Sequence, residues 1–420
     1  MSHSPSSLPE ETHYAKTRTS RKYSPNEGEV VQIAEYLPGR LYFATFKTSG
    51  RPHGTDKDHF FTTDDVFIYL PFNFDFGPLC LPSIIRYCYL VKTKLSSIEL
   101  RDKRIIHYTS LDRPYDRANA TLLISAFAVL FLGHSPAEAL ERCSTPGLKV
   151  PPYRDASANP SSRHIRISDC LSALAVACRL RLFDPCDFDV VDCERARCRG
   201  DMSWVVPCRL LAFGGPRGSG LGLRPSAFVD YFKASGVVGV VRLNRPEYDA
   251  EEFERVGLRV HDLYFPDGTP PSRGLARHFL RLCTEAEAVR GALAVHCKAG
   301  LGRTGVLIAS RLVSRYGLRP REAVAWLRLC RPGSIMSSQQ EWLECNEGFL
   351  RSVDDGRRTE QLDPNTASEV FPFGIHSIRF GMSRIGEARR HRRVRRGNKR
   401  HAEGGKRRLS GWGTKVSSPR

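Results

Sequence analysis

The sequence has no run of apolar residues long enough to cross a membrane, which takes about 18 of them. Residues 1–28 also lack the apolar core of a secretory signal and are rich in Ser, Thr, Pro and charged residues. That composition is typical of a disordered segment. We therefore expect residues 1–28 to be disordered and the protein to be intracellular, with no membrane span.

The 13 cysteines form no C-x-x-C pair, so the sequence carries no zinc-ribbon pattern. No other group of His, Cys, Asp or Glu has the spacing of metal ligands, and we expect neither a metal nor a cofactor. In an intracellular protein we expect these thiols to be reduced.

The 420 residues carry a net charge of +19, which is unevenly spread. Residues 379–420 contain 15 Lys and Arg against two Glu, a balance of +13, so the rest of the chain is only mildly basic. We expect residues 353–420 to form a basic disordered tail. Within it, Arg389–Arg400 is dense enough in charge to bind a nuclear import receptor or nucleic acid. The expected location is the nucleus and cytoplasm.

The chain repeats itself at an offset of 184 residues. Residues 122–140 align without gaps to residues 306–324, and each copy follows a predicted strand that ends near a histidine, His107 or His296. The matched positions include a Gly, a Pro and a Glu (Gly133 with Gly317, Pro136 with Pro320, Glu138 with Glu322). A repeated strand–helix unit favours an α/β protein with two tandem domains of similar fold.

Hydrophobic patterning predicts the individual elements. We expect strands over residues 41–45, 66–70, 104–107, 208–213, 237–243, 261–265 and 291–295. We expect helices over residues 82–95, 120–132, 165–182, 272–290, 306–316, 320–329 and 341–350. The first domain is placed at residues 29–190, an acidic linker at 191–212 and the second domain at 213–352.

Val295–Gly305 (VHCKAGLGRTG) lies between a predicted strand and a predicted helix. Glycines at 300 and 302 let backbone N–H groups turn inward together, and such a nest at a helix N-terminus binds an anion of phosphate size. Arg303 can hold two phosphate oxygens with its planar fork. The same positive potential favours the thiolate of Cys297, a nucleophile aimed at a bound phosphorus.

The remaining loop residues have supporting roles. His296 can brace the loop from behind, and the Thr304 hydroxyl can bond the sulfur. The candidate phosphate-binding residues are His296, Lys298, Ala299, Gly300, Leu301, Gly302, Arg303 and Thr304.

Attack of a thiolate on a phosphate ester needs an acid for the leaving oxygen. Asp267, on a Gly/Pro-rich turn 30 residues before the thiol, is the candidate, with Asp262 as a weaker alternative. Hydrolysis of the cysteinyl-phosphate then needs a positioned water, which Gln339 and Gln340 can orient while Asp267 acts as base.

The first copy of the repeat keeps the scaffold without this chemistry. Tyr108 takes the place of Cys297, Asn119 falls opposite Arg303, and the intervening loop has no glycine. We expect the first domain to be catalytically degenerate.

These motifs resemble those of the cell-division-cycle-fourteen family of dual-specificity protein phosphatases. In the second domain the resemblance rests on residues 265–268, 296–305, 330–334 and 339–340, and in the first on residues 75–78, 106–109, 117–120, 154–157 and 204–207. It covers about residues 30–350. It implies two tandem phosphatase-like domains, each a central mixed sheet flanked by helices, of which only the second is active.

The resemblance also implies a function, a partner class and, as candidate sites of action, the spindle, centrosome and basal body. The family removes phosphate from Ser/Thr-Pro sites written by cyclin-dependent kinases, and from phosphotyrosine, in cell-cycle control. An acidic groove between its domains reads a basic residue after the site. This chain departs from the pattern because Arg195, Arg197 and Arg199 interleave with the carboxylates of residues 184–201.

Two other functions are consistent with the loop. A phosphoinositide phosphatase would place a second lysine where Leu301 stands here. A non-catalytic phosphoprotein-binding scaffold would not need Cys297, Arg303 and Asp267 together.

Overall fold

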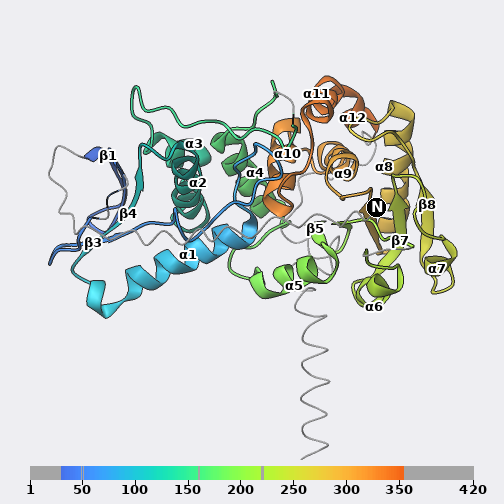
Figure 1. Ribbon diagram of the computed structural model, residues 1–420, viewed down its shortest axis with the longest axis horizontal. Coiled ribbons are helices and arrows are strands. Elements are labelled where there is room, and N and C mark those ends of the chain that lie inside the picture. Colours follow the sequence, from blue (N-terminus) through green and yellow to red (C-terminus); the bar gives the residue numbers. More distant parts are fainter. Residues whose placement is uncertain (1–29, 49, 51, 159–160, 219–221, 354–420) are drawn as a thin grey trace, which may run out of the picture.

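The computed structural model describes residues 30–48, 50, 52–158, 161–218 and 222–353. The predictions for residues 1–28 and for the tail after Val353 lie outside the described residues. Within the described part, two mixed sheets with their helices lie side by side along the longest axis of the molecule (Figure 1). The prediction of an α/β chain with two tandem domains is confirmed.

The first sheet has the strand order β1-β2-β4-β3, with β1 antiparallel to β2 and the other pairs parallel. Its strands are β1 (Val30–Leu37), β2 (Leu41–Phe46), β3 (Asp58–Phe61) and β4 (Arg104–Ser110). The helices of this half are α1 (Leu81–Ser96), the short 3₁₀ helix η2 (Ile98–Leu100), α2 (Pro114–Phe131), α3 (Pro136–Glu141) and α4 (Ile167–Arg179). Ser135 and Glu138 form a reciprocal capping box at the start of α3, as the Ser-Pro-x-Glu pattern predicts.

The second sheet has the order β5-β6-β9-β7-β8, with only the β5–β6 pair antiparallel. Its strands are β5 (Ser203–Val206), β6 (Leu210–Phe213), β7 (Val237–Arg242), β8 (Arg259–Asp262) and β9 (Ala292–His296). The helices are α5 (Val190–Gly200), α6 (Ser226–Ala234), α7 (Glu251–Glu254), α8 (Arg273–Ala288), α9 (Gly302–Ser314), α10 (Pro320–Cys330), α11 (Ser337–Cys345) and α12 (Glu347–Val353).

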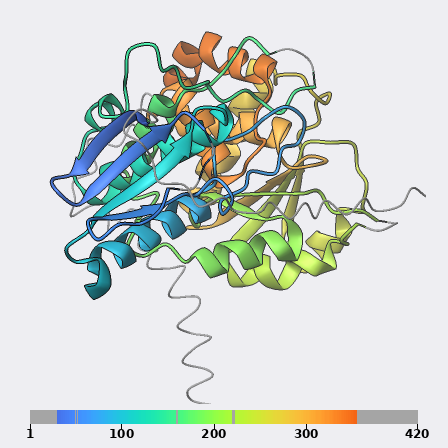
Figure 2. The ribbon, with the colours of Figure 1, turned by 60° about the vertical axis from the view of Figure 1, so that its left-hand side comes forward.

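Alternate residues of the second sheet pack into two different layers. On β9, Leu293 and Val295 join the core beneath α8 to α12, whereas Ala292 and Ala294 join the core beneath α5 to α7. Figure 2 shows the result, with the orange helices on one side of the sheet and the green and yellow-green helices on the other. Because both faces are buried, β9 reads as a continuous apolar run, and the candidate phosphate-binding loop follows its carboxyl end.

The two domains share one continuous hydrophobic core. Helix α4 of the first domain packs along α10 of the second. At this junction Arg321 donates to Asp169 (2.8 Å) and to the carbonyl of His164 (2.6 Å). A shared core of this kind holds the two domains in a fixed relation.

Three sequence-based expectations are corrected by the structure. Residues 66–70 form no strand: Val66 and Ile68 are 64% and 68% exposed, because a turn that begins at the carbonyl of Thr63 directs only the intervening aromatic side chains toward the core. The predicted linker at 191–212 consists of α5 and the first two strands of the second sheet. Because this segment mixes acidic and basic residues, its sequence pattern did not indicate a helix. Helix α5 nevertheless covers the edge of the second sheet.

The last predicted helix, at 341–350, is two helices, α11 and α12, and the first begins at Ser337. No helix among residues 30–353 that the structure describes is both long and apolar enough to span a membrane.

Candidate functional site

The loop after β9 turns its carbonyl groups outward. Each of the five carbonyl oxygens from Cys297 to Leu301 accepts a hydrogen bond. In chain order the donors are His296 Nδ1 (3.0 Å), Gly215 N (3.1 Å), Arg331 Nη2 (2.9 Å), Arg331 Nε (2.8 Å) and Gly305 N (3.0 Å). The bond to Leu301 is the first intrahelical bond of α9, whereas the other four carbonyls are held by groups around the loop, an arrangement that leaves backbone N–H groups of the loop free to face inward. The loop therefore has the geometry of a phosphate cradle.

Glycine is required at 300 for this course of the backbone. Gly300 has a φ of +66°, and a Cβ atom there would lie 2.0 Å from the carbonyl oxygen of Phe213 on β6. The predicted need for glycine is confirmed at this position. Gly302 has a different role, because it is the first residue of α9 and lies against the Gln339 amide, 3.1 Å from where a Cβ would be.

Arg331 supports the loop from behind, a role that the sequence did not reveal. Its side chain is buried, holds the carbonyls of Ala299 and Gly300, and forms an ion pair with Asp201 (Nη2–Oδ2 2.5 Å, Nη1–Oδ1 3.0 Å). Asp201 ends α5 in the left-handed conformation, with φ of +50°. Arg331 is therefore a residue that positions the loop. Asp201 holds the Arg331 side chain in place and does not serve a groove that binds a basic residue of a substrate.

Cys297 lies at the carboxyl end of β9, with 3% of its surface exposed. Helix α9 begins at Gly302, four residues earlier than expected, so the N–H groups of its first turn, which lack intrahelical acceptors, follow Cys297 closely in the chain. The Thr304 hydroxyl is buried and has no hydrogen-bond partner among the described residues, so its bond to the sulfur stays a prediction.

His296 is held as a neutral ring. Its Nδ1 lies 3.0 Å from the carbonyl oxygen of Cys297 and its Nε2 lies 2.8 Å from the hydroxyl of Tyr248. Because a carbonyl only accepts, Nδ1 carries the proton and Nε2 accepts from Tyr248. Burial lowers the pKa of His296 to about 4, so the ring braces the loop and does not transfer protons near neutral pH.

Arg303 and Asp267 meet at the mouth of the loop. Arg303 donates through Nη1 to the carbonyls of Leu243 (3.3 Å) and Phe265 (3.2 Å), which fixes its buried guanidinium. Its Nε lies 3.1 Å from Oδ1 of Asp267, without the alignment of a hydrogen bond. Asp267 is 66% exposed and also accepts from Gly268 N, so it can move toward a leaving group. A fixed guanidinium with donors to spare suits a phosphoryl group.

The alternative acid, Asp262, is engaged elsewhere. It accepts from Nε (2.6 Å) and Nη2 (2.9 Å) of Arg242, and these hydrogen bonds hold the pKa of Asp262 below its ordinary value. A carboxyl group that is kept ionised in this way is a poor proton donor. The structure therefore favours Asp267 for the acid.

The two glutamines are placed differently. Gln339 accepts from Met336 N and donates to the carbonyl of Thr269 (3.2 Å), on the turn that carries Asp267. Gln340 is buried and donates to Glu344 (3.0 Å) within α11. The structure therefore brings Gln339 to the loop and the acid turn, whereas Gln340 is directed along its own helix.

The same arrangement has known counterparts. Residues 35–177 match the family described as dual specificity protein phosphatase, N-terminal half, and residues 226–317 match the DSP-PTPase phosphatases of polymorphic toxin systems. Human dual specificity protein phosphatase CDC14C is 36% identical over 338 residues, which are 79% of this chain and 73% of that protein. The chain belongs to the CDC14 family of dual-specificity protein phosphatases.

Other members of the CDC14 family are longer than this chain. Human CDC14A is 42% identical over 333 residues, and zebrafish CDC14AB is 40% identical over 345 residues. The matched region is 77% and 80% of this chain but only 55% and 56% of those two proteins. The chain thus spans little more than half the length of these relatives.

In this CDC14-family chain the first domain has the same strand–loop–helix scaffold, but different side chains stand at the positions of Cys297 and Arg303. The ring of Tyr108, at the position of Cys297, packs edge-on against Phe46. Asn119, opposite Arg303, donates to the carbonyl of Phe76 (2.8 Å), and the buried Arg117 donates to that of Lys149 (2.8 Å). These polar side chains hold connecting segments in place.

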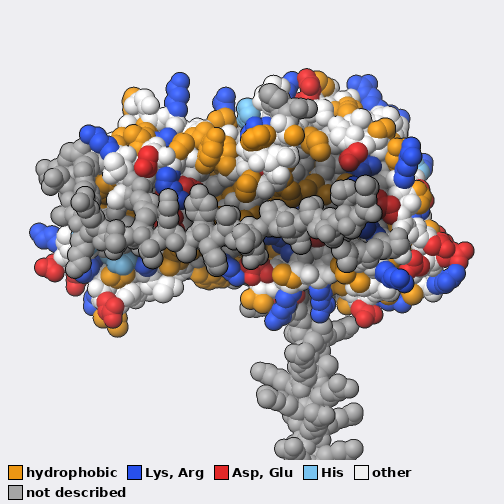
Figure 3. Space-filling view, viewed as in Figure 1, with side chains coloured by type: hydrophobic (Ala, Val, Ile, Leu, Met, Phe, Trp, Pro, Cys, Tyr) orange, Lys and Arg blue, Asp and Glu red, His pale blue; other side chains and the backbone are white. Residues whose placement is uncertain are grey.

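Several carboxylates of residues 184–201 are already engaged within the fold. Glu194 pairs with Arg86 (2.7 Å), Asp201 pairs with Arg331, and Asp189 caps α5 by accepting from Asp192 N (2.9 Å). On the face seen in Figure 3, acidic and basic side chains are mixed along the visible rim of the molecule. Glu194 and Asp201 are therefore less available to a basic residue of a substrate than unpaired carboxylates would be.

A buried histidine makes the stability of this CDC14-family chain dependent on pH. Burial lowers the pKa of His107, on β4, to about 3, below the unfolded value of about 6.5. The unfolded state therefore binds more protons below pH 6.5, and the free energy of unfolding falls on acidification. Between pH 7 and pH 4.5 we expect a loss of about 2–3 kcal/mol from this group. Urea unfolding at several pH values measures it.

The variant His107→Gln isolates this contribution. Its free energy of unfolding should depend less steeply on pH than that of the wild type. His278→Gln, at an exposed position on α8, is the matched control and should leave the pH dependence unchanged. Parallel pH profiles for the wild type and His107→Gln would contradict the assignment.

Proposed function

We propose that this chain is a cysteine-dependent dual-specificity protein phosphatase that hydrolyses phospho-Ser/Thr-Pro sites, and phosphotyrosine, on proteins. Its role would be to reverse phosphorylation by cyclin-dependent kinases in cell-cycle control. The observation that carries the proposal is the loop that follows β9 from Cys297, in which the carbonyls of residues 297–300 are held by groups around the loop, with Arg303 fixed beside Asp267. Relatives with dual-specificity phosphatase names support the substrate class.

In the first step the thiolate of Cys297 attacks phosphorus. The inward N–H groups and Arg303 bind the three non-bridging oxygens and stabilise the charge that develops on them. As the S–P bond forms, the P–O bond to the substrate breaks, and Asp267 gives its proton to the leaving oxygen. The product is a cysteinyl-phosphate and a free hydroxyl group.

In the second step water attacks the cysteinyl-phosphate. Asp267, now ionised, takes a proton from the water while the P–S bond breaks and the thiolate is restored. Gln339 lies between the loop and the acid turn, where its amide can orient that water. Ser338 donates to the carbonyl of Gly268 (3.1 Å) and holds the same turn.

A substrate panel tests the proposal against phosphoinositide hydrolysis. We expect the kcat/KM for phospho-Ser-Pro peptides to exceed that for phosphoinositide vesicles by about 100-fold or more, since Leu301 offers no charge to a second phosphate. A second Ser-Pro peptide that differs only by a Lys after the site should have a kcat/KM less than about tenfold higher than the peptide without it. The reason is that Glu194 and Asp201 already form ion pairs with arginines of the chain. Faster turnover of the lipid would reject the protein substrate class, and no turnover at all would favour a binding scaffold.

Asp267→Asn tests the acid. Alkyl phosphates, such as phosphoserine peptides, have a poor leaving group, and we expect kcat to fall by about 100-fold or more for them. An aryl phosphate whose leaving group is an acidic phenol needs little proton transfer, so kcat for this substrate should fall much less. Asp262→Asn is the control and should not show this dependence on the leaving group. An equal loss on both substrates would show that Asp267 is not the acid.

We also propose a nuclear and cytoplasmic location, with Arg389–Arg400 as a binding segment for an import receptor or nucleic acid. This segment, outside the described residues, has eight Lys or Arg in twelve positions. Contacts of these side chains with nucleic-acid phosphates would weaken steeply with salt. Changing the eight residues to Ser should reduce nuclear accumulation, whereas an unchanged location would place the signal elsewhere.

A further inference from the structure

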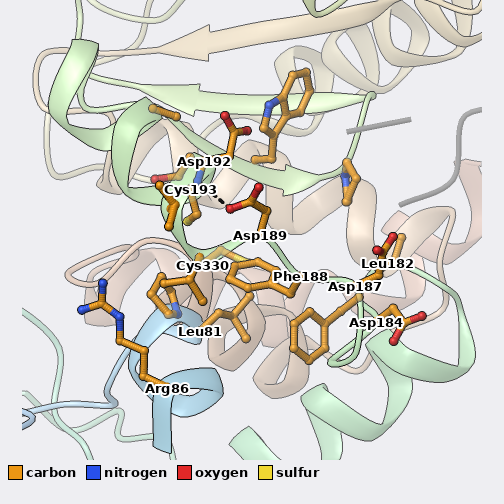
Figure 4. Close-up of a pocket in the computed structure, with 18 of the residues that line it drawn as sticks. Leu81, Arg86, Leu182, Asp184, Asp187, Phe188, Asp189, Asp192, Cys193 and Cys330 are labelled. Atoms are coloured by element: carbon orange, nitrogen blue, oxygen red, sulfur yellow. Dashed lines mark hydrogen bonds between the residues drawn. The ribbon is translucent and has the colours of Figure 1, made fainter. Parts of the chain in front are cut away.

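A cavity of about 480 Å³ lies between the two domains, on the outer edge of the second sheet. Its floor is apolar and comes from distant parts of the chain: Leu81 on α1, Phe183 and Phe188 after α4, and Trp204 on the edge strand β5. In Figure 4 the Phe188 ring lies between Leu81 and the α5 segment that carries Asp192 and Cys193. A cavity of this size and lining suits the side chains of a bound peptide.

The mouth of the cavity is acidic. Asp184, Asp187, Asp189 and Asp192 all line it, and Figure 4 shows their carboxylates distributed around one side. Asp184 and Asp189 accept backbone hydrogen bonds, and in the described part of the chain no ion pair is found for Asp184, Asp189 or Asp192. Burial and the neighbouring Asp189 raise the pKa of Asp192, while Arg195 and Arg199 on the same helix lower it in part. The chemistry of the cavity therefore favours an apolar ligand with positive charge beside it.

The rim of the cavity adds exposed apolar surface. Tyr89 on α1 is 46% exposed and Val191 on α5 is 52% exposed, and both line the opening. Exposed apolar side chains around an apolar hollow mark a surface that binds a partner.

The sequence itself contains a segment of matching chemistry. Residues 370–385 read VFPFGIHSIRFGMSRI, with aromatic rings at Phe371, Phe373 and Phe380. Residues 370–396 as a whole hold eight Arg and one Glu, so apolar side chains lead directly into a strongly basic run. This combination is complementary to an apolar cavity with an acidic mouth.

We propose that residues 370–396 of this chain dock on the cavity, with phenylalanine side chains inside and the arginines over the acidic mouth. The 18 residues from Val353 to Phe371 extend to about 60 Å at most, whereas a compact body of this size has a radius of gyration of about 20 Å. The segment can thus reach the cavity from the end of α12. Docking here places the basic run beside the domain junction and occupies a surface distinct from the catalytic loop.

Binding of a labelled peptide of residues 370–396 to the full chain, followed by fluorescence anisotropy, tests the proposal. In the wild type the chain's own segment competes at an effective concentration near the millimolar range. The full chain with Phe371→Ser, Phe373→Ser and Phe380→Ser should therefore bind the added peptide about tenfold or more tightly than the wild type. Adding Tyr89→Lys and Val191→Lys to that variant should remove the increase in affinity for the added peptide.

Two controls separate docking from general charge attraction. Ile98→Lys, at a 90% exposed position on η2 beyond the C-terminal end of α1, should leave peptide binding unchanged. A peptide with serine at its three phenylalanine positions should bind at least about tenfold more weakly than the native one. Equal binding of the two peptides, or equal binding to the wild type and the phenylalanine variant, would overturn the proposal. A dimer that depends on the phenylalanines would also overturn it, because the occupant would then be a second copy.

Discussion

Cys297→Ser is expected to lower kcat by a factor on the order of 10⁴ or more, because the hydroxyl of serine is a far weaker nucleophile than a thiolate. That factor corresponds to about 5.4 kcal/mol of transition-state stabilisation. The cradle of inward N–H groups is formed by the backbone and by Arg331, so it stays intact in the variant. Phosphopeptide affinity, measured by calorimetry, should therefore remain within a few fold of the wild type.

A matched substitution separates the nucleophile from other thiols. Cys330→Ser lies at the end of α10, directly before Arg331, and is buried like Cys297. It should retain most of the turnover if it folds, which a melting curve establishes. Substantial turnover in Cys297→Ser would contradict the thiolate mechanism.

Arg303→Ala is expected to lower kcat/KM by a factor on the order of 10³ and to abolish measurable phosphopeptide binding. The guanidinium is buried and fixed by the carbonyls of Leu243 and Phe265, and its Nε has no hydrogen-bond partner among the described residues. The kcat/KM values for aryl and alkyl phosphates should fall by the same factor, because the phosphoryl group that Arg303 binds is common to both. This pattern differs from that of Asp267→Asn, where the loss depends on the leaving group.

Arg303→Lys and Lys298→Ala complete the comparison. Lysine keeps the charge but loses the planar fork, so Arg303→Lys should recover only a small part of the activity. Lys298 is exposed on the loop and its carbonyl, not its side chain, is held by Gly215. Lys298→Ala should therefore have a much smaller effect than Arg303→Ala, and an equal effect would contradict the special role of the guanidinium.

The local features of the site were predictable from the sequence because they depend on neighbours in the chain. An apolar strand, a thiol, glycines and an arginine in Val295–Gly305 predict the cradle, and Gly300 has the positive φ that such a loop needs. The repeat at an offset of 184 residues likewise predicted two domains of similar fold. In each case short-range geometry leaves few other conformations open.

The long-range contacts were not predictable in the same way. The ion pair between Arg331 and Asp201 joins residues that are 130 apart in the sequence, and no pattern in either segment predicts this contact. Gln339 and Gln340 are adjacent in sequence, yet helix geometry sends one toward the loop and the other toward Glu344. The segment at 191–212 has the composition of a linker, and only the pairing of its strand β6 with β9 and the packing of α5 on α1 make it part of the fold.

The most direct test of the central claim is to trap the phosphorylated enzyme. A ³²P-labelled phosphoserine-proline peptide is mixed with the full chain, the reaction is stopped with acid within one turnover, and the labelled tryptic peptides are identified. Attack by Cys297 predicts label on the tryptic peptide Gly291–Lys298 (GALAVHCK), with none in Cys297→Ser. Label on a peptide from the first domain, or turnover at the full rate without any labelled enzyme, would contradict it.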